Sequence, residues 1–143
     1  MSKRTPSHIF QHPAQQASNG AALLLRVQQA MLLHQQGRVD QAAEIYGAVL
    51  RIQPGQPDCL HYLGVARHQS GRSEEAVELI RQAIQAGASH AAAYSNLGLA
   101  LHRLGRLQEA IDSFDRALAL ERRFADALNN RGNVMRDLGR LAE

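Results

Sequence analysis

Three histidines, His34, His68 and His102, recur at intervals of 34 residues. Imidazole nitrogen is a common zinc ligand, and a bound zinc ion holds such nitrogens at roughly 2.0–2.1 Å. Packed helices lie about 8–10 Å apart, so equivalent side chains on successive helices do not converge easily on one ion. We therefore expect no metal site, and we expect these histidines to face a partner or the solvent.

Two asparagines, Asn96 and Asn130, share a second register of the same period. A side-chain amide offers both a donor and an acceptor, so a column of asparagines can bind the backbone of an extended peptide. Gln28 and Tyr62 fill the two preceding positions, so only half of this column consists of asparagine. The alternative interpretation is that both asparagines are ordinary repeat residues.

The chain has a single cysteine, Cys59, which excludes an intrachain disulfide. His61 is near in sequence, but residues two apart on a helix do not face each other. We expect an inert, half-buried thiol. The sequence also has no phosphate-binding glycine loop, no zinc motif and no nucleophile with a neighbouring base. We therefore predict that the chain is not an enzyme and has no cofactor.

The elements that carry these residues repeat as well. The stretch 91–124 contains two amphipathic helical patterns around Gly105, and a shift of 34 residues superposes it on 57–90. Self-similarity at this period is typical of a helical repeat array. The pattern predicts helices over residues 21–36, 39–52, 57–70, 73–86, 91–104, 107–120 and 125–138, and the start of another at 141–143.

Small residues occupy two further registers. Gly64, Gly98 and Gly132 lie within first helices, where a glycine costs roughly 0.5–1 kcal/mol against alanine and is tolerable if the partner helix packs closely. The alanines expected on the second helices are Ala42, Ala76 and Ala110. The glycines expected in left-handed conformation after first helices are Gly37, Gly71, Gly105 and Gly139.

This spacing resembles the tetratricopeptide repeat family, whose pattern runs aromatic, Leu-Gly, a large residue, Ala and an aromatic. The third repeat matches it with Tyr94, Leu97, Gly98, Leu101, Ala110 and Phe114. The resemblance covers residues 23–143 and implies an all-α, right-handed α-solenoid of helix-turn-helix repeats. Three full repeats are expected at about 23–56, 57–90 and 91–124, with a truncated fourth at 125–143. Because the pattern stops within that repeat, we expect a fragment of a longer protein, and we expect residues 1–20 to form a flexible leader.

The resemblance implies that first helices line a concave groove that binds a protein or peptide segment. The residues carried over to that groove are His61, Tyr62, Val65, His68, Ser95, Asn96, Leu99, His102, Arg103, Asn129, Asn130, Asn133 and Arg136. Chaperone-binding members use a carboxylate clamp of cationic and asparagine side chains in the first repeat. Val27 and Met31 occupy those positions here, so the resemblance does not support a clamp.

The asparagine register also resembles the ladder of O-linked N-acetylglucosamine transferases and their bacterial relatives. The alternative function is therefore an N-terminal substrate-recognition fragment of a larger enzyme of that kind. A third hypothesis is self-association through the apolar first helix, in which Leu23, Leu24 and Leu25 follow one another.

Charge and hydropathy narrow the classes of partner. The formal net charge is +3, and Lys3 and Arg4 in the first 22 residues contribute two of these charges. The repeats are nearly neutral, which does not fit a nucleic-acid-binding surface. No apolar run is long enough for a signal peptide or a membrane span. We expect a cytoplasmic protein that binds neither nucleic acid nor membrane.

Overall fold

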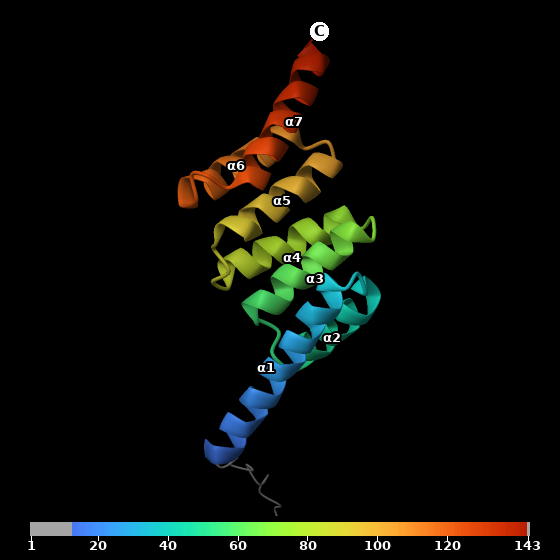
Figure 1. The fold of residues 1–143 in the computed structure, drawn as a ribbon, viewed down its shortest axis with the longest axis vertical. Coiled ribbons are helices and arrows are strands. Elements are labelled where there is room, and N and C mark those ends of the chain that lie inside the picture. Colours follow the sequence, from blue (N-terminus) through green and yellow to red (C-terminus); the bar gives the residue numbers. More distant parts are fainter. Residues whose placement is uncertain (1–12, 143) are drawn as a thin grey trace, which may run out of the picture.

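The computed structural model describes residues 13–142. Over this range the chain forms helices and no strands, stacked along one long axis (Figure 1). The helices are α1 (Pro13–Gln35), α2 (Val39–Ile52), α3 (Pro57–Gln69), α4 (Ser73–Gln85), α5 (Ala91–Arg103), α6 (Leu107–Leu120) and α7 (Ala125–Ala142). They pair into the hairpins α1–α2, α3–α4 and α5–α6, which is the all-α solenoid that the period predicted.

The turns inside the hairpins explain the sharp ends of the first helices. Gly71 follows α3 with φ +80° and Gly105 follows α5 with φ +74°, the left-handed region in which L-residues with a Cβ are disfavoured. The amide of Gly71 donates to the carbonyl of His68, and that of Arg72 donates to Arg67 at 2.8 Å. These two bonds satisfy carbonyls that the helix end would otherwise leave unpaired.

Close packing inside the hairpins depends on glycine and alanine. A Cβ at Gly98 would lie 2.7 Å from Cζ of Phe114, and one at Gly64 would lie 2.6 Å from Cγ1 of Ile80. Phe114, Ile80 and the facing Ala76 are completely buried. The predicted close approach is therefore confirmed at both glycines, but the third, Gly132, has nothing within 4 Å among the described residues.

Curvature separates two faces of the array. The backbones of the first helices α1, α3, α5 and α7 approach one another in order, whereas within residues 13–142 those of α2, α4 and α6 do not, and α4 and α6 meet only through side chains such as Arg81 and Glu109. We call the surface of α1, α3, α5 and α7 the first-helix face, and that of α2, α4 and α6 the second-helix face. The closer spacing places the first-helix face on the inside of the curve.

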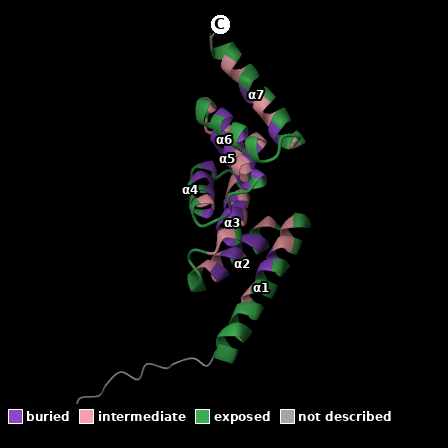
Figure 2. Cartoon of the chain, turned by 90° about the vertical axis from the view of Figure 1, so that its left-hand side faces the viewer, coloured by how far each residue is buried: buried purple, intermediate pink, exposed green. Residues whose placement is uncertain are grey.

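The two ends differ from the sequence prediction. Helix α1 begins at Pro13 instead of Ala21, so residues 13–20 of the expected leader are helical and exposed (Figure 2), while residues 1–12 lie outside the described range. Proline suits the first position of a helix, and alanine and glutamine follow it. Helix α7 continues through Gly139 to Ala142, so Leu141 does not begin another helix. Glu143 lies outside the described residues.

Within the described range, no helix is both long enough and apolar enough to cross a membrane.

Candidate functional site

The first-helix face contains a pocket of about 210 Å³. Three helices of this face and one second helix contribute its lining, which is Met31, His34, Gln35, Tyr46, Tyr62, Val65 and Asn96. None of these residues is an aspartate, glutamate, lysine or arginine. The pocket therefore combines an apolar and aromatic wall with the amides of Gln35 and Asn96, and it suits an uncharged group.

A chain of aromatic rings connects this pocket to the interior. The ring of Tyr46 lies 6.0 Å from that of Tyr62 and stacks at 20°, and the ring of His61 lies 4.8 Å from Tyr62. His34 on α1 lies 6.0 Å from Tyr46, and His90 lies 5.1 Å from His61. The pairs Tyr46–Tyr62 and His61–Tyr62 are stacked and the two outer pairs are tilted, all at centroid separations that favour aromatic packing.

The two tyrosines keep their phenolic protons at neutral pH. Burial raises the pKa of Tyr46, and the neighbouring Tyr62 and Cys59 raise it further. Burial also raises the pKa of Tyr62, with a contribution from the charge of Asp58. The hydroxyl of Tyr46 lies 3.4 Å from Nδ1 of His34. Tyr46 is completely buried, so its phenol is available to His34 and not to a bound segment, whereas the half-buried Tyr62 can also meet a bound group.

The register of the first helices that contains Val27, His61 and Ser95 lies below the surface. His61 and Ser95 were expected in the groove, but their side chains are 1% and 3% exposed. The first helix of the next repeat covers this register, and only Asn129 on α7 is exposed. His61 and Ser95 are thus not accessible to a bound segment in this structure. His61 instead supports the site from beneath, through Asn96.

Each of the three histidines that recur every 34 residues, His34, His68 and His102, has its own neighbour. Nε2 of His34 lies 2.6 Å from Oε1 of Gln69, and Nε2 of His102 lies 2.6 Å from Oδ2 of Asp137. Nδ1 of His68 lies 3.0 Å from Oγ of Ser73. No three histidine, cysteine, aspartate or glutamate side chains gather around a common point in residues 13–142. The arrangement connects successive helices and does not form a metal-ligand set.

The other expected groove residues follow the first-helix face toward α7. Leu99, Asn130 and Asn133 are half-buried, as are Tyr62 and Asn96, whereas Arg103 and Arg136 are exposed.

Sequence reasoning missed Tyr46, because it lies on a second helix. Tyr46 shares its register with Ile80 and Phe114, which are buried. A tyrosine in that register was the signal that could have identified this residue, because its hydroxyl must reach a polar neighbour.

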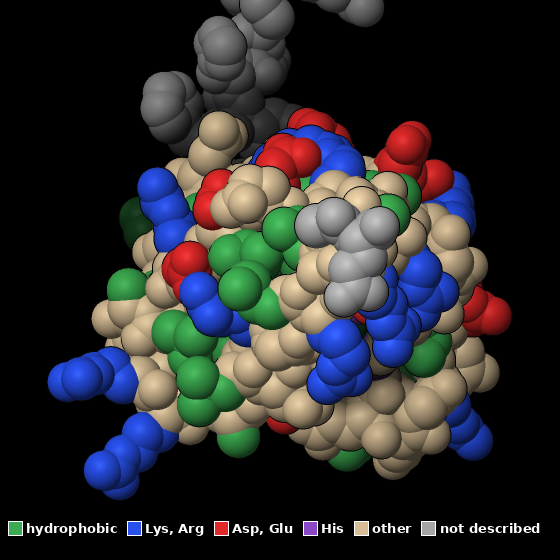
Figure 3. Space-filling model, turned by 90° about the horizontal axis from the view of Figure 1, so that it is seen from above, with side chains coloured by type: hydrophobic (Ala, Val, Ile, Leu, Met, Phe, Trp, Pro, Cys, Tyr) green, Lys and Arg blue, Asp and Glu red, His purple; other side chains and the backbone are tan. Residues whose placement is uncertain are grey.

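Both ends of the array expose apolar side chains. On α1, Leu24, Leu25 and Leu32 are more than half exposed. At the other end, seen in Figure 3, hydrophobic side chains lie among basic and acidic ones. The large exposed apolar residues there are Leu120, Leu128, Met135 and Leu141. Self-association through α1 thus remains a prediction that these exposed side chains permit.

Solved structures of similar fold are numerous. The first repeat domain of Spaghetti (RPAP3), bound to HSP90 peptide SRMEEVD, is 24% identical with a TM-score of 0.76 and covers 82% of this chain and 93% of its own. An O-GlcNAc transferase from Thermobaculum terrenum is 25% identical with a TM-score of 0.78, over 81% of this chain and 22% of its own. MamA is 30% identical with a TM-score of 0.70, over 77% of this chain and 64% of its own. No curated protein matches the chain.

The family assignment comes from the repeats themselves. A family model described as tetratricopeptide repeat matches residues 27–90 and again residues 63–123, which together span most of the array. The matched range contains the hairpin turns at Gly37, Gly71 and Gly105 and the close contacts at Gly64 and Gly98. This chain therefore belongs to the tetratricopeptide repeat family.

Proposed function

We propose that the chain is a protein-interaction scaffold whose first-helix face binds a peptide or protein segment. The observation that carries this proposal is the uncharged pocket among α1, α2, α3 and α5. Its volume of about 210 Å³ is large enough for one apolar or aromatic side chain. The amides of Asn96 and Gln35 lie beside it, where they can bind the backbone of the same segment.

The chemistry of the pocket favours one kind of segment. The Spaghetti (RPAP3) domain is bound to HSP90 peptide SRMEEVD, so the fold presents a peptide-binding surface in that protein. The pocket of this chain has no cationic side chain, and burial of an unpaired carboxylate would cost several kcal/mol. We therefore propose an uncharged apolar or aromatic side chain as the central contact.

Binding of a captured partner tests this proposal. A partner recovered on the immobilised chain from its native host is identified by mass spectrometry, and its shortest binding peptide is labelled for fluorescence anisotropy. Val65→Arg should raise the Kd at least about tenfold, because it places a charge in an uncharged pocket. The double variant Asn96→Ala and Asn130→Ala should also weaken binding. Gln41→Ala, at an exposed position on α2, is the control.

Unchanged affinity of both groove variants, with helicity preserved in circular dichroism, would remove the first-helix face from consideration.

A second candidate function is substrate recognition for a larger enzyme. The Thermobaculum terrenum O-GlcNAc transferase is similar to this chain over 22% of its own length. Asn96 and Asn130 provide two members of an asparagine ladder on the first-helix face. Sequencing the coding region beyond Glu143 separates the two functions. A glycosyltransferase domain there would support recognition for an enzyme, whereas further repeats alone would support the scaffold.

A further inference from the structure

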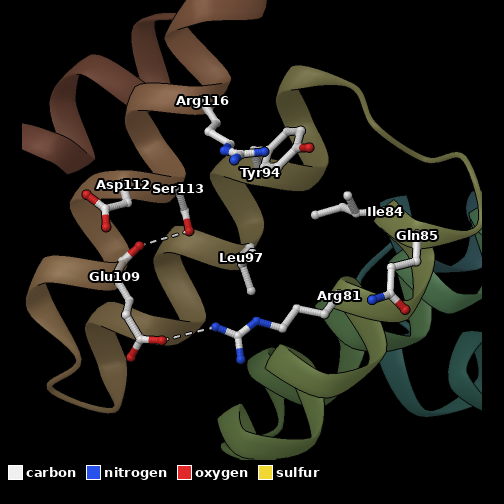
Figure 4. A pocket seen from close by; sticks show the side chains of 9 residues that line it. All are labelled: Arg81, Ile84, Gln85, Tyr94, Leu97, Glu109, Asp112, Ser113 and Arg116. Atoms are coloured by element: carbon white, nitrogen blue, oxygen red, sulfur yellow. Dashed lines mark hydrogen bonds and ion pairs between the residues drawn. The ribbon is translucent and has the colours of Figure 1, made fainter.

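The second-helix face contains a larger cavity, of about 430 Å³, between α4 and α6 (Figure 4). Leu97 and Tyr94 on α5 form its floor, and Ile84 on α4 lines one side. Leu97 is buried, while Ile84 and Tyr94 are half-buried. The floor is thus apolar and partly open to solvent, and it lies on the opposite side of the array from the first-helix face.

One residue type explains why the cavity is open here. Ser113 lines it on α6, and the equivalent residue of the preceding repeat, 34 positions earlier, is Leu79. Leu79 packs against the buried cluster of Leu60, Ala83 and Ala88, and so occupies the corresponding space. Ser113 is smaller, and its hydroxyl donates to the carbonyl of Glu109 at 2.9 Å. The short side chain leaves apolar surface that a leucine would cover.

Charged side chains surround this floor. Arg81 and Glu109 form an ion pair of 3.1 Å across one end of the cavity. At the other end, Cζ of Arg116 lies 6.0 Å from the ring centroid of Tyr94. Asp112 lies on α6 one turn before Arg116 and accepts a hydrogen bond from Gln108. Neither Asp112 nor Arg116 has an ion-pair partner among the residues that the structure describes.

We propose that this cavity is a second protein-binding site, which takes an apolar side chain flanked by one basic and one acidic residue. The apolar side chain lies over Leu97 and Ile84, where Ser113 leaves room. The basic residue pairs with Asp112 and the acidic residue with Arg116, which satisfies both unpaired charges. Opposite charges on the two partners favour this register and disfavour segments of a single charge.

Peptides of known sequence test the site directly. The probe is the blocked peptide acetyl-Lys-Ala-Leu-Ala-Glu-amide, titrated into the ¹⁵N-labelled chain. We expect chemical-shift changes centred on the amides of α4 and α6. A peptide with serine in place of leucine, and one with glutamine in place of both charged residues, should each bind at least about fivefold more weakly. Equal binding of all three peptides, or no binding of the first, would overturn the proposal.

The protein variants separate this site from the first-helix face. Ser113→Leu introduces the residue that the preceding repeat already carries, and it should raise the Kd at least about tenfold. Ser89→Leu is the matched control at an exposed position, and Val65→Arg is the control in the other pocket. Both should bind the probe as the unmodified chain does. Equal binding by Ser113→Leu, or loss of binding in Val65→Arg, would contradict the assignment.

A second variant covers the case in which Ser113→Leu disturbs the fold. Asp112→Asn with Arg116→Gln removes both charges at exposed positions and preserves side-chain size. This variant should lose the preference for the charged probe over its glutamine analogue. A preserved preference would show that these two residues do not select the ligand.

Discussion

The side chain of Asn96 on α5 donates its amide hydrogen to Nε2 of His61 on α3, over 2.9 Å. Nε2 must therefore be the unprotonated nitrogen, and Nδ1 carries the proton of the neutral ring. Nδ1 is buried and has no partner among the described residues. Burial, together with a smaller effect of the nearby His90, lowers the pKa of His61 from 6.5 to about 4.

This pair predicts a loss of stability in mild acid. The folded state holds His61 neutral, whereas the unfolded state takes up a proton as the pH falls through 6.5. Where the unfolded state binds more protons than the folded state, the free energy of unfolding decreases as the pH decreases. The protein therefore loses stability between pH 6.5 and about 4. Complete titration of this group would remove on the order of 3 kcal/mol. Urea unfolding at several pH values measures it.

His61→Gln provides the control for that measurement, because glutamine can still accept a hydrogen bond from Asn96 but does not titrate. The variant should show a shallower dependence of unfolding free energy on pH between 6.5 and 4. An identical slope in both proteins would assign the acid sensitivity to other groups.

A change at Arg103 should alter the histidine of the neighbouring helix. His34 faces Gln69 and His102 faces Asp137, each 35 residues on, and the equivalent neighbour of His68 is Arg103. Burial lowers the pKa of His68, and the positive charge of Arg103 lowers it further. Arg103→Asp copies the pair of the next repeat, so the pKa of His68 should rise. Titration of the histidine rings by NMR measures the change.

Arg122→Asp is the matched control, since Arg122 is exposed in the turn between α6 and α7. It should leave the titration of His68 unchanged, and a similar rise in both variants would indicate a general charge effect.

The repeat period predicted the ends of some helices but not the end of α7. The period placed α2 and α6 at their observed ends, because each hairpin repeats the same turn chemistry at Gly37, Gly71 and Gly105. The period also placed Gly139 in that role, but α7 runs through it to Ala142. No further second helix packs against α7 within residues 13–142. A glycine in this register therefore does not by itself end the helix.

The site was predictable only in part, for a related reason. Register alone assigned His61 and Ser95 to the groove, although the adjacent first helix covers them. Tyr46 was missed because it lies on a second helix, and Ser113 was missed because it departs from its register by its small size. Such a departure changes the local shape of the protein surface, and the family pattern does not specify it. The cavity at Ser113 therefore depends on an exception to the repeat.

Two glycines of one register, Gly98 and Gly132, should respond differently to alanine. Gly98→Ala would place a methyl group 2.7 Å from the buried ring of Phe114, and overpacking of this kind costs roughly 1–3 kcal/mol. Alanine recovers about 0.5–1 kcal/mol of helix propensity, so a net loss of about 1–2 kcal/mol is expected. Gly132→Ala meets nothing within 4 Å among the described residues and should stabilise the protein. Thermal unfolding of the two variants in parallel would reveal the opposite signs, and a destabilised Gly132→Ala would contradict this account.

The thiol of Cys59 should report local opening of α3. It is 0% exposed, and burial, together with a smaller effect of the charge of Asp58, raises its pKa to about 11. Since the thiolate is the reactive form, a disulfide reagent at pH 8 should modify Cys59 slowly in the native protein and rapidly in urea.

The helix cap next to this thiol provides a variant that tests how Cys59 becomes accessible. The side-chain oxygen of Gln56 accepts a hydrogen bond from the amide of Cys59 at 2.6 Å, at the N-terminus of α3. Loss of such a cap costs about 1 kcal/mol, so Gln56→Ala should increase the population of the opened end and speed modification about fivefold. Gln53→Ala, at an exposed position in the same turn, is the matched control. Equal rates in both variants would mean that Cys59 becomes accessible through global unfolding and not through fraying of α3.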